Sequence, residues 1–297
     1  DKALAAWNGL AIAAFADAST ALGTARGDGG ERADRGAADR AAADRAAADR
    51  AAAYRAAAVR SAEVILDGLL ATDGSIGRSW KDGRASGSGV LEDYTHLADG
   101  LLALYEATFD ERWFTTARAL MDHVLVHFAD PGGGFFDTSD QHERLVTRPK
   151  DVQDNAVPSG NAMAAAVLLR LHALTGEPAY RTAADRALRT VVPYVARYPT
   201  GFAQWLVAMD LAVSPIIEIA VAGSPDAPET LALLAEARRG YRPGQVLAVA
   251  TDPTASAIPL LEGRLAIDGR PTAYVCRGFV CRLPVTTVEL LRAELEA

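Results

Sequence analysis

A chain of 297 residues, half of them hydrophobic and 23% charged, has the composition of a globular protein that buries a sizeable core. Its formal net charge of −8 disfavours nucleic acid and anionic membranes as partners, because both bind clustered Lys and Arg side chains. No segment reaches the roughly 18 consecutive apolar residues of a transmembrane helix, so we expect no membrane partner.

The start of the chain and its two cysteines indicate a piece of a longer protein and a cellular compartment. The sequence begins with Asp1-Lys2 rather than Met and shows no basic-then-apolar leader, so we expect a piece of a longer protein. Cys276 and Cys281 are too few for a disulfide framework, and their spacing is not that of a Cys-x-x-Cys redox site. We therefore expect partly buried structural thiols in a cytoplasmic protein.

A threefold repeat runs through the first two hundred residues. The apolar runs Leu101–Leu104 and Leu168–Leu171 lie 67 positions apart, and each is followed at the same spacing by an aromatic residue, Trp113 or Tyr180. A first copy ends in a helix that contains Tyr54. Apolar residues at helical spacing in each copy predict three antiparallel helical hairpins, stacked in chain order.

A low-complexity insertion at about residues 24–53 replaces the short turn of the first hairpin. Its Ala-Ala-Ala-Asp-Arg cycle has a period of five residues, which advances a helix by about 140° beyond a full turn. The charges therefore spiral around the helix and leave no apolar stripe to bury, although alanine and arginine both favour helix. We expect a solvated helical extension; a partner-binding arm is the alternative.

Long connections join the hairpins at about residues 72–91 and 130–158. The first predicts a β-hairpin that turns at Asp82-Gly83. The second predicts another short strand pair, formed by Gly132–Asp137 and Arg144–Val146. Long loops on one face of a rigid scaffold are where functional sites usually lie, so we expect the site on this face.

The pattern of apolar and polar residues changes after Pro215. Strand patterns alternate with helical patterns, which predicts a small three-stranded α/β domain over 214–297, after a helical domain over 1–213. The expected strands are 216–223, 245–250 and 272–276, and the expected helices are 227–240 and 288–296. The predicted fold class is thus mainly α, with a small α/β unit at its C-terminal end.

The repeat also predicts a rim of candidate binding residues. Tyr94 lies 67 positions before Asn161, and Asn8 occupies the equivalent place in the first copy. Each stands where a long loop enters a helix, so unpaired helix N–H groups should gather there. The rim is expected to consist of Trp7, Asn8, Asp93, Tyr94, Ser159 and Asn161. Helix capping is the alternative role for Ser159 and Asn161.

Such a rim suits a sugar, which needs flat aromatic surfaces for its C–H faces and carboxylates for its hydroxyls or for proton transfer. Trp7, Trp80, Tyr94 and Phe136 are the candidate aromatic surfaces. Asp93 and Asp154 are the candidate catalytic pair, with Glu92 as the alternative to Asp93; an inverting hydrolase places two carboxyl groups about 6.5–9.5 Å apart. Lys150 and Asp151 are further binding candidates, interpreted as an ion pair that orients the substrate rather than as a Schiff-base lysine.

The histidines do not predict a metal centre. His123 and His127 are four residues apart, but they lack the Glu of a His-Glu-x-x-His motif and an evident third ligand. His96 is interpreted as a packing or surface residue rather than a catalytic base. We expect neither a metal nor a cofactor.

Several motifs in this order resemble the spermatogenesis-associated protein 20-like family of thioredoxin-domain-containing proteins. They are Ala6-Trp7-Asn8-Gly9-Leu10, Glu92-Asp93-Tyr94, Gly132-Gly133-Gly134-Phe135-Phe136, Pro158-Ser159-Gly160-Asn161 and Ala273-Tyr274-Val275-Cys276. The resemblance covers nearly the whole chain except the Ala/Asp/Arg tract.

The resemblance implies a fold and two competing functions. The helical part is similar to the six-hairpin (α/α) toroids of glycoside hydrolases and sugar epimerases, so the chain would be an incomplete toroid that lacks further hairpins and the N-terminal thioredoxin-like domain. This implies a carbohydrate-active or carbohydrate-binding domain, glycoside hydrolase-like or sugar epimerase-like, with a sugar or sugar derivative as partner. The alternative is a non-catalytic scaffold or substrate-binding module that serves the thioredoxin domain.

Overall fold

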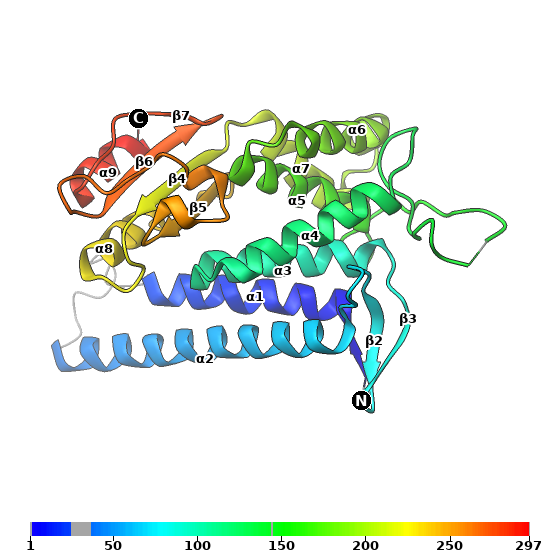
Figure 1. Cartoon of the computed structure of the whole chain (residues 1–297), viewed down its shortest axis with the longest axis horizontal. Helices are drawn as coiled ribbons and strands as arrows, with labels where there is room; N and C mark the ends of the chain where they lie inside the picture. Colours follow the sequence, from blue (N-terminus) through cyan, green and yellow to red (C-terminus); the bar gives the residue numbers. More distant parts are fainter. Residues whose placement is uncertain (1, 25–36, 144, 297) are drawn as a thin grey trace.

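The computed structural model describes residues 2–24, 37–143 and 145–296, and in these the chain is mainly helical with two small β-sheets (Figure 1). Three helical hairpins are present, as predicted: α1 (Ala5–Thr24) with α2 (Ala37–Leu69), α3 (Leu91–Thr108) with α4 (Glu111–His127), and α5 (Gly160–Thr175) with α6 (Pro178–Val195). Helices α1, α3 and α5 pack side by side in chain order, and α7 (Ala203–Val213) packs on α5. None of the described helices combines the length and the apolar character that a membrane span requires.

Two-residue turns close the second and third hairpins. In each turn a left-handed residue ends the first helix, Phe109 with φ 55° or Gly176 with φ 71°. An acidic N-cap follows: the carboxylate of Asp110 accepts a hydrogen bond from the backbone of Arg112, and that of Glu177 does the same for Ala179. Left-handed C-caps and acidic N-caps both satisfy helix-end groups that have no partner inside the helix.

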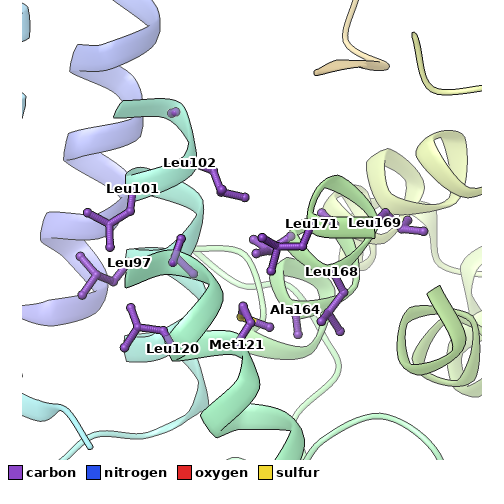
Figure 2. Close-up of a cluster of buried hydrophobic side chains, with 14 of the residues drawn as sticks. Leu97, Leu101, Leu102, Leu120, Met121, Ala164, Leu168, Leu169 and Leu171 are labelled. Atoms are coloured by element: carbon purple, nitrogen blue, oxygen red, sulfur yellow. The ribbon is translucent and has the colours of Figure 1, made fainter. Parts of the chain in front are cut away.

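Leucines at helical spacing form the core between the hairpins (Figure 2). Leu97 and Leu101 from α3, Leu120 from α4, and Leu168 and Leu171 from α5 are all at most 1% exposed. Burying one such side chain stabilises the fold by about 1.5–3 kcal/mol. The apolar periodicity of the repeat therefore predicts the faces on which these helices pack.

The Ala/Asp/Arg tract is helical from Ala37 onward, as predicted, and continues without a break into the rest of α2. Side chains between 41 and 50 are mostly exposed, whereas Ala58, Ala62 and Ile65 are buried against α1. The part of the insertion before Ala37 and after Thr24 lies outside the described residues.

The first long connection folds as predicted. Strands β2 (Gly77–Lys81) and β3 (Arg84–Ser88) pair antiparallel around Asp82 and Gly83, which have φ of 50° and 77°. Positive φ at both turn residues matches the right-handed twist of the strands. A short strand, β1 (Ala3–Leu4), pairs with β2 and completes this sheet.

The second predicted strand pair is wrong. Residues 132–137 form no strand, and Arg144 lies outside the described residues. Gly133 and Gly134 both have positive φ, 106° and 71°, and fold the chain back so that Phe135 bridges Ala129. Consecutive glycines favour such a compact turn over an extended strand.

The C-terminal segment is an α/β unit whose four-stranded sheet has the order β5-β4-β6-β7. Strands β4 and β5 are parallel, whereas β6 pairs antiparallel with β4 and β7. The elements are β4 (Ile217–Ala222), α8 (Pro228–Ala237), β5 (Gln245–Ala250), β6 (Thr272–Arg277), β7 (Val280–Cys281) and α9 (Val288–Glu296), with 3-10 turns at Pro253–Ala255 and Pro259–Leu261. A further 3-10 turn, Pro199–Gly201, lies between α6 and α7 in the helical part. The sequence predicted three of these strands; the fourth is too short to leave a pattern.

One face of this sheet belongs to the helical core. Ala220, Val246 and Ala248 are buried in the same cluster as the leucines of α3 and α5. The opposite face packs on Leu234 of α8 and Leu291 of α9. The sheet therefore lies between the hairpins and these two helices.

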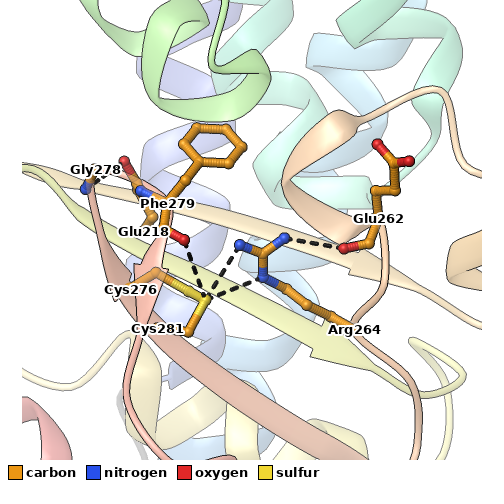
Figure 3. The surroundings of a disulfide bond; sticks show 7 residues. All are labelled: Glu218, Glu262, Arg264, Cys276, Gly278, Phe279 and Cys281. Carbon is orange, nitrogen blue, oxygen red and sulfur yellow. Dashed lines mark hydrogen bonds between the residues drawn. A yellow bond between two sulfur atoms is a disulfide. The ribbon is translucent and has the colours of Figure 1, made fainter.

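Cys276 and Cys281 form a disulfide, so the prediction of two free thiols is wrong (Figure 3). Antiparallel pairing of β6 with β7 places the two residues directly opposite each other. The intervening segment turns through Gly278 and Phe279, which have φ of 58° and 64°. The spacing in the sequence therefore reflects a tight hairpin.

We predict that two glycine-to-alanine substitutions in α1 act in opposite directions. A Cβ on Gly9 would lie 2.4 Å from the backbone carbonyl of His96 in α3, so Gly9→Ala should lower the free energy of unfolding by about 2 kcal/mol or more. Gly23 has no heavy atom within 4 Å of that position, so Gly23→Ala should raise it by about 0.5–1 kcal/mol. Urea unfolding measures both, and equal effects would contradict a close contact between α1 and α3.

Candidate functional site

The N-termini of α1, α3, α5 and α7 meet on the face that carries the long loops. Asp93 in the first turn of α3 accepts a hydrogen bond from Ala6 at the start of α1. A Cβ on Gly160, the first residue of α5, would lie 3.0 Å from the backbone nitrogen of Glu92. Four helix starts therefore share one surface, where their free N–H groups attract negative charge.

Asp93 is buried beneath this surface, at 1% exposure. Its carboxylate accepts hydrogen bonds from Ala6 N at 3.1 Å, from Val90 N at 3.0 Å and from the Arg78 guanidinium at 3.2 Å. Burial nevertheless raises the pKa of Asp93 to about 6, and these donors only partly offset it. The group is thus poised to hold a proton close to neutral pH.

Asp154 joins two other helix starts in the same way. One carboxylate oxygen accepts a hydrogen bond from Ser159 N at 2.8 Å, just before α5, and the other accepts one from Gln204 N at 2.9 Å, in α7. Both members of the predicted catalytic pair therefore tie helix N-termini together. Their catalytic role stays a prediction.

A hollow of about 310 Å³ opens beside these caps, between the start of α3, the start of α5 and the second long loop. Its polar side chains include three carboxylates, one guanidinium and two amides: Glu92, Asp137, Asp151, Arg78, Gln153 and Asn155. Ser159 also lines it, together with Pro149 and Pro158. Such a mixture of acceptors and donors suits a ligand rich in hydroxyl groups.

The carboxylates of the hollow are held by neighbours on its rim. Arg78 donates to Glu92 at 3.0 Å and to Asp93 at 3.2 Å, so one guanidinium serves both a carboxylate of the hollow and the buried carboxyl behind it. Both oxygens of Asp137 accept from the backbone nitrogen of Asp151 at 3.0 Å. Burial raises the pKa of Asp137 as well.

Asn161 and Ser159 hold the loop that forms one wall. Asn161 is fully buried; its amide oxygen accepts from Phe135 N at 2.8 Å, and its nitrogen donates to the carbonyls of Phe135 and Asp151. Ser159 caps α5 by accepting a hydrogen bond from Ala162 N. The capping alternative is thus confirmed for Ser159, while Asn161 fixes the loop to the helix.

The predicted aromatic residues do not line this hollow. Trp7 is 64% exposed in the first turn of α1, and Trp80 lies half-buried in β2, against Gly68. The amide of Asn8 donates to the carbonyl of Leu4, within its own helix start. The ring of Phe136 carries the guanidinium of Arg148 on its face.

Tyr94 faces a second hollow, of about 520 Å³, on the other side of α3. Its hydroxyl accepts a hydrogen bond from Ile76 N at 3.0 Å, and its ring stacks on His123 with the centroids 5.1 Å apart. Tyr94 is only 2% exposed, which leaves little of its ring for a ligand. The equivalent repeat positions thus contribute to different surfaces.

Lys150 does not pair with Asp151, which corrects the predicted ion pair. Its ammonium group lies 2.5 Å from Asp130 and 2.8 Å from the carbonyl of Gly133, so it closes the glycine turn. The carboxylate of Asp151 instead accepts from the backbone nitrogen of Gln153. Adjacent residues in an extended loop point in different directions, which explains the error.

The histidines are engaged in local contacts. His127 lies 2.9 Å from the carboxylate of Asp140, and its ring centroid is 4.4 Å from that of His123. His96 is buried and donates from Nε2 to the carbonyl of Pro158, and burial lowers its pKa. Within the described part of the chain, no group of three or more His, Cys, Asp or Glu side chains is arranged to hold a metal ion.

Sequence reasoning missed two charged residues of the hollow, Asp137 and Arg78, as well as its amides Gln153 and Asn155. Asp137 follows the Gly-Gly-Gly-Phe-Phe segment, for which the sequence predicts a strand, and Arg78 lies in the hairpin before α3. The available signal was charge: Arg78 is a cation in the loop immediately before the acidic pair Glu92 and Asp93. Glu92, the predicted alternative to Asp93, is the member of that pair that lines the hollow.

We predict that Asp93 makes the stability of the fold depend on pH. Its pKa is about 6 in the folded chain against an ordinary aspartate value of 3.8, so the folded state binds more protons than the unfolded state between these values. The free energy of unfolding should therefore fall as pH rises through that window, by up to about 3 kcal/mol relative to Asp93→Asn. Urea unfolding at pH 4 to 7 measures the difference. A difference that stays constant or grows with pH contradicts the assignment, and Asp226→Asn, at an exposed aspartate, controls for loss of one charge.

No family model matches the chain, whereas curated proteins do. Spermatogenesis-associated protein 20 of mouse and of human is each 33% identical to it over 204 residues, which are 67% of this chain and 26% of the relative. An uncharacterized protein of Caenorhabditis elegans is 25% identical over 205 residues, 67% of the chain and 27% of the relative. The chain thus aligns with about a quarter of the length of the curated relatives it matches.

Proposed function

The chain belongs to the spermatogenesis-associated protein 20-like family, and we propose that its loop face binds a carbohydrate. The observation that carries the proposal is the hollow beside the helix N-termini, where Glu92, Asp137 and Asp151 stand with Arg78 in about 310 Å³. Carboxylates accept hydrogen bonds from sugar hydroxyls, and a guanidinium donates to ring and hydroxyl oxygens. The volume is at the lower end of the range for small-molecule sites.

The hairpin arrangement supports an incomplete (α/α) toroid as the setting of this site. Helices α1, α3, α5 and α7 form an inner layer in chain order, and α2, α4 and α6 pack outside their partners. The last inner helix, α7, exposes Leu206 and Val207 at 44% and 49%. Apolar side chains on that flank are what a further hairpin would cover.

Asp93 and Asp154, which do not line the hollow but hold the helix starts beside it, are the proposed catalytic pair. A carboxyl group with a pKa near 6 suits a general acid at neutral pH, which glycoside hydrolysis requires. Turnover would need Asp93 to exchange one of its three hydrogen bonds for the substrate. The proposed reaction is hydrolysis or epimerisation of a sugar.

We predict that Glu92→Gln and Asp137→Asn each weaken sugar binding by about tenfold, because each removes a charged acceptor from the hollow. A panel of mono- and oligosaccharides and sugar phosphates, screened by ligand-observed NMR against the whole chain, measures the affinities. The matched control is Asp226→Asn, which removes one carboxylate from the exposed loop just before α8 and should leave affinity unchanged.

The same screen decides between the two functions. Binding lost in Glu92→Gln but kept in Asp226→Asn supports the carbohydrate site, and loss of turnover in Asp154→Asn then supports the catalytic pair. If no sugar in the panel binds to the folded chain, the carbohydrate proposal fails. The non-catalytic scaffold that serves a thioredoxin-like domain would take its place.

A further inference from the structure

We propose that Cys276 and Cys281 form a thiol–disulfide exchange site for low-molecular-weight thiols and disulfides, in which Cys281 is the exchanging sulfur and Cys276 resolves the mixed disulfide. The pair closes the β6–β7 hairpin at the C-terminal end of α5, where Phe279 packs against Gly176 (Figure 3). This place is remote from the helix N-termini of the loop face, so the inference stands apart from the carbohydrate proposal.

A buried arginine faces the sulfur of Cys281. The guanidinium of Arg264 donates to this sulfur from Nη2 at 3.1 Å and from Nε at 3.3 Å. Arg264 is only 9% exposed. Among the residues that the structure describes, no carboxylate lies within ion-pair distance of it, and the carboxylate of Glu218 in β4 acts on its charge from farther away.

The charge of this arginine favours the reduced form of the pair. A disulfide sulfur is a weak acceptor, whereas a thiolate makes charge-assisted hydrogen bonds with a guanidinium. Reduction would therefore place a negative charge within hydrogen-bond distance of the buried guanidinium, closer than the carboxylate of Glu218. Positive charge beside a cysteine lowers the thiol pKa and makes the thiolate available at neutral pH.

Exposure separates the roles of the two sulfurs. Cys276 is 1% exposed, whereas Cys281 lies on the two-residue edge strand and is partly exposed. A hollow of about 520 Å³ beside the pair is lined by Arg264, Phe279 and His172, among others. Neither cysteine is among the residues that line this hollow, so a small thiol reaches Cys281 at the partly exposed edge strand, next to Arg264.

The exchange balances as two successive displacements. In oxidation, the Cys281 thiolate attacks a small disulfide RSSR, which forms a Cys281–S–S–R bond and releases RS⁻. The Cys276 thiolate then attacks the Cys281 sulfur, which forms the internal disulfide and releases a second RS⁻. Two cysteine thiols lose two protons and two electrons, and RSSR becomes two RSH; reduction by RSH is the reverse.

The hairpin turn is held independently of the disulfide. The carboxylate of Glu218 in β4 accepts from Gly278 N at 3.1 Å and from Phe279 N at 2.7 Å. Phe279 also presents its ring to Arg264. The two sulfurs therefore stay close together after reduction, which favours the internal resolving step over release of the mixed disulfide.

The test uses single-cysteine variants of the whole chain and glutathione disulfide as the probe. Cys276→Ser keeps the exposed thiol, and Cys281→Ser keeps the buried one. We expect Cys276→Ser to form a mixed disulfide at least about tenfold faster at pH 7, with a reactivity midpoint below the ~8.5 of an ordinary cysteine. Intact-mass spectrometry after an acid quench measures the rates, and peptide mapping of the wild type locates the trapped adduct on Cys281.

Arginine variants made in the Cys276→Ser background test the electrostatic part. Arg264→Gln should slow the reaction at pH 7 about three- to tenfold and move the midpoint upward. Arg282→Gln is the matched control, since this neighbouring arginine pairs with Glu294 instead of the sulfur, and its rate should stay within about twofold. Arg264→Met, which keeps a long apolar side chain but removes the charge, covers the case in which Arg264→Gln does not fold.

Two results overturn the proposal. One is that folded Cys276→Ser reacts no faster than Cys281→Ser, or no faster than the same chain unfolded in urea at the same pH. The other is that the pH profile is the same in Cys276→Ser alone and with either folded Arg264 variant added. In both cases the disulfide is a structural cross-link only.

Discussion

The helix N-termini on the loop face impose the constraint on which the candidate site depends. Each helix begins with N–H groups that have no partner within the helix, and α1, α3, α5 and α7 bring theirs to one surface. Two carboxylates accept hydrogen bonds from such N–H groups, and each joins two helices. Asp93 bonds to α1 and to the start of α3, and Asp154 bonds to the start of α5 and to α7. Negative charge at helix N-termini also complements the helix dipoles. The acidic character of this face is thus first a requirement of the fold.

On this face, a carboxylate can either accept hydrogen bonds from backbone N–H groups or face a ligand in the hollow. Carboxylates that satisfy backbone donors are less free for a ligand, and Glu92, which faces the hollow and is held by the side chain of Arg78, is better able to receive it. Arg78 connects the two sets, because it pairs with Glu92 and with the buried Asp93 at once. A ligand that draws Arg78 or Glu92 away changes the charge around Asp93. Binding of the proposed ligand in the hollow would therefore be coupled to the protonation of the buried carboxyl.

Local sequence patterns predict the features that short segments determine. Periodic leucines such as Leu101 and Leu168 identify the hairpins and their buried faces, and Asp82-Gly83 identifies the first loop hairpin, because helical period and turn chemistry are properties of short segments. Contacts between residues far apart in the sequence leave no such local pattern. Nothing near Asp93 in the sequence indicates that Ala6 will donate to it, and nothing near Lys150 points to Asp130, 20 residues earlier.

The sequence therefore placed several candidate residues correctly at the helix starts of the loop face but gave some of them the wrong contacts. The repeat register correctly placed Asp93 and Ser159 at helix starts, yet it treated equivalent positions as facing one mouth. Tyr94 shows why this assumption fails. Different sides of α3 face the two hollows, and the side chain of Tyr94 points to the second hollow. The disulfide was not predicted, for a related reason. Cys281 lies in a two-residue strand, and only its register with β6 brings it opposite Cys276.

The C-terminal sheet owes its position to contacts that the disulfide does not make. Its inner face is buried in the helical core through Ala220 and Val246, and the hydroxyl of Tyr105 in α3 accepts a hydrogen bond from Val249 of β5. Strand β7, by contrast, pairs only with the end of β6. Opening the Cys276–Cys281 bond would therefore affect only the edge of the sheet, where Glu218 still holds the turn, and leave the sheet anchored. Local opening of this kind costs far less than global unfolding, and a fold that tolerates both redox states is what a reversible exchange site requires.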